Sequence, residues 1–62
     1  MAGYREYRDE AGRELMIQNK GGFYSWSAVW KDDHAMAYCG KTMREVLDDI
    51  AGDATGKLTR IF

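Results

Sequence analysis

The sequence predicts an α+β fold, in which an antiparallel meander of three to four strands carries one helix packed on one face. Two observations predict it. Residues 23–30 hold four aromatic rings, which alternate with small or polar residues as in a strand with one buried face. Thr42-Met43-Arg44-Glu45 is a capping box that begins an amphipathic helix. Since each element has one apolar face, sheet and helix are expected to bury these faces against each other.

Two strands are expected before the aromatic segment. Residues 4–8 alternate weakly, whereas residues 13–18 alternate clearly, with Leu15 and Ile17 on one face. Turn-forming residues follow each strand, at 9–12 and 19–22, and Gly12 is able to take the positive φ that closes a hairpin.

The third strand is expected over residues 23–31 and a fourth, central strand over residues 35–39, with a turn at residues 32–34 between them. The expected buried face of the third strand carries Tyr24, Trp26, Ala28 and Trp30. The two tryptophans are therefore interpreted as core residues, with their indole nitrogens hydrogen-bonded near the edge of the core.

The helix is expected over residues 43–51, with Thr42 as its N-cap and Gly52 at a left-handed C-cap. Its apolar stripe consists of Met43, Val46, Leu47 and Ile50. Residues 57–62 have the composition of a short C-terminal strand. This segment would add to an edge of its own sheet, cross to a partner or stay frayed, and the sequence leaves these alternatives open.

The chain has 62 residues and is expected to form one small domain over residues 1–62. One cysteine, Cys39, cannot form an intrachain disulfide, and with His34 it supplies two metal ligands at most. No metal site, cofactor or catalytic group is therefore expected, and Cys39 is interpreted as a small buried side chain. The eight aromatic residues exceed what one helix covers, which predicts a homodimer or higher oligomer.

The formal net charge is −1, and acidic and basic residues are interspersed. The longest apolar run covers residues 35–39, far below the roughly 18 residues of a membrane span. The polar N-terminal residues have no signal-peptide character. A cytoplasmic protein without a membrane segment is expected.

The order of strands and turns, followed by the helix at Gly40-Lys41-Thr42-Met43-Arg44-Glu45-Val46-Leu47, resembles the HicB family of antitoxins over residues 13–51. Members of that family have a three-stranded meander followed by a helix with a Gly-x-Thr-x-x-Glu-Ala-Leu-like start. This chain lacks the family's proline-containing loop and a separate DNA-binding tail, so the resemblance extends to the interaction half. It implies a protein that neutralises another protein by binding it.

The same pattern is similar to the three-stranded DNA-binding sheets of plant transcription factors and tyrosine recombinases. The alternative function is therefore a sheet-based DNA-binding regulator, whose phosphate contacts would come from Arg13, Lys20 and Lys31. Neighbouring acidic residues and the net charge of −1 disfavour this alternative.

The function favoured by the sequence is protein binding, by a small intracellular modulator or inhibitor of the antitoxin or phage-accessory, anti-defence type, in a bacterial or phage setting. Phe23, Met36 and Tyr38 are expected to form an exposed apolar patch that contacts the partner. Asp48 and Asp49 place acidic groups at the helix C-terminus, where the helix dipole disfavours them. They are either tolerated there without a role or form an acidic patch for a basic partner, which makes them a second candidate contact.

Overall fold

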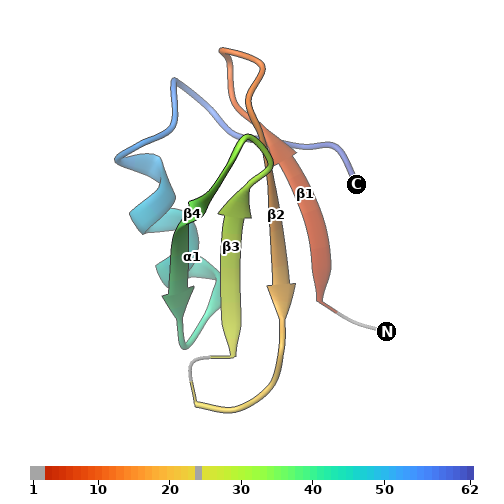
Figure 1. Ribbon diagram of the computed structural model, residues 1–62, viewed down its shortest axis with the longest axis vertical. Helices are drawn as coiled ribbons and strands as arrows, with labels where there is room; N and C mark the ends of the chain where they lie inside the picture. Colours follow the sequence, from red (N-terminus) through yellow and green to blue (C-terminus); the bar gives the residue numbers. More distant parts are fainter. Residues whose placement is uncertain (1–2, 24) are drawn as a thin grey trace.

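The computed structural model describes residues 3–23 and 25–62 and contains a five-stranded antiparallel sheet with one helix. Figure 1 shows the longer strands of this sheet and the helix. The strand order is β4-β3-β2-β1-β5. The elements are β1 (Tyr4–Arg8), β2 (Glu14–Asn19), β3 (Trp26–Trp30), β4 (Asp33–Gly40), α1 (Met43–Ala51) and β5 (Thr59–Arg60). The predicted α+β class is confirmed.

The core lies between the sheet and α1, which packs on β3 and β4. Leu15, Ile17 and Trp30 from the sheet and Val46 and Ile50 from the helix are completely buried. In β2 and β3 these residues are separated by residues on the opposite face, as the period of a strand requires. The helix approaches β4 closely at Gly40, where an added Cβ atom would lie only 3.0 Å from Val46 Cγ2.

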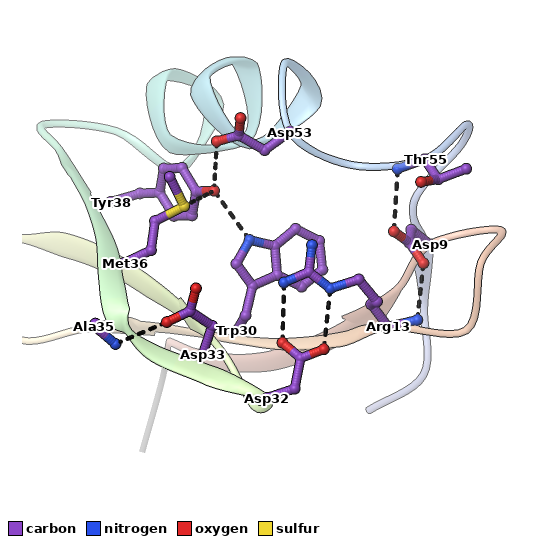
Figure 2. Close-up of polar contacts among 10 residues, drawn as sticks. All are labelled: Asp9, Arg13, Trp30, Asp32, Asp33, Ala35, Met36, Tyr38, Asp53 and Thr55. Atoms are coloured by element: carbon purple, nitrogen blue, oxygen red, sulfur yellow. Dashed lines mark hydrogen bonds and ion pairs between the residues drawn. The ribbon is translucent and has the colours of Figure 1, made fainter.

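Tyr38 is a core residue, so its predicted place in an exposed patch is wrong. It pairs with Ala28 across the sheet, on the helix-covered face, and is 8% exposed. Its hydroxyl accepts a hydrogen bond from Trp30 Nε1 at 3.0 Å and donates to Asp53 Oδ2 at 2.7 Å (Figure 2). Burial, and then the Asp53 hydrogen bond, raise the pKa of Tyr38. The expected bonding of the Trp30 indole nitrogen is confirmed.

Asp9 connects the β1–β2 turn to the segment after the helix. Its Oδ1 accepts hydrogen bonds from the amides of Ala11 at 3.0 Å and Arg13 at 2.8 Å, and its Oδ2 accepts from the Thr55 amide at 3.1 Å. Figure 2 shows the bonds from Arg13 and Thr55. The residue is 4% exposed. These amide bonds, above all the one from Thr55, lower the pKa of Asp9. One carboxylate therefore stabilises two loops that are far apart in sequence.

The β3–β4 hairpin differs from the prediction. The third strand begins at Trp26, the turn lies at Lys31–Asp32, and β4 is an edge strand instead of a central one. The register shifts between Val29, which pairs with Ala37, and Trp30, which pairs with Asp33. This irregularity lengthens β4 relative to β3. The predicted position of Tyr24 on the buried face lies outside the described residues.

Two small residues near the helix also differ from expectation. Cys39 is exposed, because its pairing with Ser27 places it on the face opposite the helix. Gly52 is the C-cap but has φ −70° and ψ −22°, a right-handed conformation. Its amide still bonds to the carbonyls of Asp49 and Ile50, which satisfies the helix end without a left-handed residue.

The C-terminal segment adds to its own sheet, which is the first of the three alternatives. Thr59 and Arg60 pair with Arg8 and Tyr7 of β1. Beyond β5, the Ile61 amide bonds to the Glu6 carbonyl at 2.8 Å. β5 thereby pairs with the outer edge of β1, at the end of the sheet opposite β4.

The predicted cap and span of α1 are confirmed. Thr42 Oγ1 accepts from the Glu45 amide at 3.2 Å, whereas Glu45 Oε1 accepts from the Lys41 amide at 3.3 Å instead of from the cap residue itself. Replacing Thr42 by alanine removes the cap acceptor, and we expect a loss of ~1 kcal/mol in the free energy of unfolding. Urea unfolding of the two proteins measures this loss, and an unchanged midpoint would show that the cap contributes nothing.

Candidate functional site: the open face of the sheet

The face of the sheet opposite α1, here called the open face, is ordered in three rows by the strand register. The first row is Tyr4, Gln18, Ser27 and Cys39, and the second is Glu6, Met16, Val29 and Ala37. Arg8 and Glu14 pair in the third row, which Lys31 extends through a bond from its amide to the Glu14 carbonyl. In the part of the chain that the structure describes, the helix packs only on the other face.

Residues of the first two rows line a partly open hollow of about 260 Å³. Its walls include the phenol ring of Tyr4, the thioether of Met16, the side chains of Val29 and Ala37, and the Cys39 thiol. Lys20, which follows β2, also lines it. Beside the hollow, the ring of Phe62 meets that of Tyr4 edge-on, with the ring centroids 5.7 Å apart. Apolar surface therefore continues across the sheet toward β5.

The third row, together with Glu6, is a network of internally paired charges. Lys31 Nζ lies 2.7 Å from Glu6 Oε1 and 3.0 Å from Glu14 Oε1, and Arg8 Nη2 lies 2.7 Å from Glu14 Oε2. Hydrogen bonds from these cations lower the pKa of both glutamates, and the two carboxylates raise the pKa of Lys31. An apolar centre beside a satisfied polar border is the organisation of many protein–protein interfaces.

The three predicted phosphate contacts do not form one basic surface. Arg13 Nη2 lies 2.9 Å from Asp32 Oδ1, and its guanidinium carbon lies 4.1 Å from the centre of the core Trp30 ring (Figure 2). Lys31 lies on the open face between two glutamates. Lys20 lines the hollow. Carboxylates thus engage two of the three cations, which leaves little positive surface for a phosphate backbone.

The predicted protein contacts are also dispersed. Phe23 is 71% exposed and lies beside Lys41, near the Gly40 end of β4, whereas Met36 is 45% exposed and lies toward its Asp33 end. Asp48 and Asp49 are exposed on α1. Because Tyr38 is buried between these regions, the structure does not unite the predicted residues in one patch. Phe23, Met36, Asp48 and Asp49 stay predicted contacts, as an alternative to the open face described above.

Sequence reasoning missed the open face, although its signal is present. Met16 alternates with the core residues Leu15 and Ile17, and Val29 alternates with Ala28 and Trp30. Met16 and Val29 are apolar members of the outward-facing set at period two, and they indicate apolar surface on that face. Grouping them into rows required the register of four strands, which a single sequence does not define.

The aromatic residues are better covered than their number suggests. Trp30 and Tyr38 are buried, and Tyr7 and Trp26 pack against the core. Tyr4, Phe23 and Phe62 remain exposed among the described residues. The homodimer or higher oligomer inferred from an aromatic excess stays a prediction.

His34 and Cys39 are both exposed. Across residues 3–23 and 25–62, no group of three or more His, Cys, Asp or Glu residues has an arrangement able to hold a metal ion. The described residues contain one helix, α1, and this helix is not long and apolar enough to cross a membrane.

Comparisons of the chain with protein-family models, with curated proteins and with solved structures find no match. The candidate site is the open face, which is described by its apolar hollow and its paired charges.

Proposed function

We propose that this chain is a small cytoplasmic protein-binding modulator or inhibitor, of the antitoxin or phage-accessory type, and that it acts by surface contact and not by catalysis. The observation that carries the proposal is the open face, where an apolar hollow adjoins charges that are already paired. A partner can cover these paired charges at low electrostatic cost, because none of the four ions has to lose its water without a partner.

The resemblance to HicB antitoxins over residues 13–51 supports the same class of function. Sheet-based DNA binding is the less favoured alternative, since Arg13 and Lys31 are engaged by Asp32, Glu6 and Glu14.

Two neighbouring residues of β4 provide a matched test. Ala37 belongs to the open face, whereas Met36 lies beside the Tyr38 hydroxyl on the helix side, with its sulfur 3.5 Å from that oxygen (Figure 2). Both residues are exposed, so we expect both glutamate variants to fold. Ala37→Glu places a charge within the hollow and is expected to weaken partner binding at least ~10-fold.

The measurement is affinity capture from the native host with the wild type, Ala37→Glu and Met36→Glu, followed by quantitative mass spectrometry. The proposal expects a protein that the wild type and Met36→Glu recover equally and that Ala37→Glu loses. Equal recovery by all three proteins, or loss with Met36→Glu alone, would place the binding surface elsewhere. Circular dichroism of each variant verifies that it is folded.

A further inference from the structure

Lys20 is the unmatched charge at the hollow. On the open face the two carboxylates Glu6 and Glu14 are paired with two cations, Lys31 and Arg8. Among the ion pairs of the described residues, none includes Lys20, although this residue lines the hollow. The surface therefore combines apolar walls with one positive charge that no carboxylate of the described chain neutralises.

The size of the hollow restricts its occupant. At about 260 Å³ it lies at the lower limit of the roughly 300–1,000 Å³ typical of small-molecule and cofactor sites. It is partly open and its walls are mainly apolar, so it suits a single large side chain inserted from outside.

The charges of the open face disfavour a second copy as the occupant. Its carboxylates Glu6 and Glu14 are already paired with Lys31 and Arg8. A second open face would therefore bring no unpaired carboxylate to Lys20, whereas a partner protein can supply one.

Resting on the proposed function, we infer that the hollow receives one large apolar side chain of a partner protein, and that a carboxylate close to this side chain in the partner pairs with Lys20. The apolar anchor supplies most of the affinity. The carboxylate fixes its orientation and adds a contribution that salt weakens, as expected for an exposed ion pair.

Two small probes separate the apolar contribution from the charged one. N-acetyltryptophan carries an indole beside a carboxylate, and N-acetyltryptophanamide carries the same indole without the charge. Each is titrated into ¹⁵N-labelled protein at low salt, and the amide signals are followed by NMR. We expect both probes to shift the signals of Met16, Val29 and Ala37. The acid should bind about 3-fold more tightly than the amide.

The preference for the acid should disappear in Lys20→Gln and persist in Lys57→Gln, a matched change at an exposed lysine in the loop after α1. Equal affinities of the wild type for the two probes, or a preference unchanged in Lys20→Gln, would overturn the role of Lys20. Absence of shifts at the hollow with both probes would overturn the anchor as well. Concentration-dependent shifts of these signals without probe would assign the hollow to a second copy.

These outcomes are distinct from a failure of the proposed function. If the hollow does not discriminate between the probes but Ala37→Glu still loses a captured protein, the open face binds a partner by a different chemistry. If Ala37→Glu and the wild type capture the same proteins, the proposed function itself fails.

Discussion

Replacing Asp9 by alanine is expected to lower the melting temperature by about 10 °C or more. The change removes the acceptor of three backbone amides, those of Ala11, Arg13 and Thr55, at a site that is 4% exposed. Buried amides without acceptors are costly, and the connection between the β1–β2 turn and the loop after α1 is lost at the same time.

Asp33→Ala is the matched control for this change. Asp33 accepts one amide hydrogen bond, from Ala35 at 3.2 Å, and is exposed (Figure 2). Water can replace that bond, so a shift of no more than about 3 °C is expected. Thermal unfolding followed by circular dichroism compares the three proteins. Similar shifts in the two variants would show that Asp9 does not have the structural role assigned to it.

The same comparison has a defined pH dependence. The pKa of Asp9 is lowered in the folded protein, so its contribution to stability is present above the pKa of an unfolded aspartate, about 4, and is lost as the pH falls through the folded value. Glu6, Glu14 and Asp32 also have lowered pKa values and act in the same direction. Asp9→Ala should therefore lose less stability than the wild type when the pH falls from 6 to 3. Its stability should still depend on pH, because the other three carboxylates remain.

Trp30→Ala is expected to destabilise the domain by ~3–5 kcal/mol. Trp30 is completely buried, and its indole nitrogen donates to Tyr38, so truncation leaves a large cavity and removes one bond of the Tyr38 hydroxyl. A domain of this length is expected to have a net stability of only ~3–9 kcal/mol. A substantial unfolded population at 25 °C is the expected result.

Trp26→Ala is the control, because Trp26 is half-buried at the opposite end of the same strand. Its truncation should cost less than half as much, since it packs against the core without being enclosed by it. Urea unfolding monitored by far-ultraviolet circular dichroism measures both losses. An equal cost for the two tryptophans would contradict the assignment of Trp30 to the centre of the core.

The sequence predicts the elements whose signals are local. Leu15 and Ile17 alternate with polar or outward residues, and Thr42 and Glu45 have the spacing of a helix cap, so β2 and α1 follow from short-range chemistry. The bulge between Val29 and Trp30 has no comparable signal. This bulge determines which residues of β3 pair with Tyr38 and Cys39. Tyr38 is therefore buried and Cys39 exposed, the opposite of what the sequence predicts.

The candidate site was less predictable because its residues meet only through long-range pairing. Tyr4, Met16, Val29 and Ala37 come from four strands, and a shift of one residue in any register would turn a side chain to the other face. The role of Asp9 is hidden for the same reason, since the Thr55 amide that it binds lies 46 residues away.

The methionine methyl groups provide the most direct test of the open face as the binding surface. Met16 lies in the hollow, Met36 lies beside Tyr38, and Met43 lies on the helix side, where its sulfur is 3.1 Å from Arg5 Nη1. The protein labelled with ¹³C at the methionine methyls is titrated with the captured partner, and the signals of Met16, Met36 and Met43 are recorded together. We predict that the Met16 signal shifts or broadens while those of Met36 and Met43 keep their positions. A shift at Met36 with an unchanged Met16 signal would contradict the account.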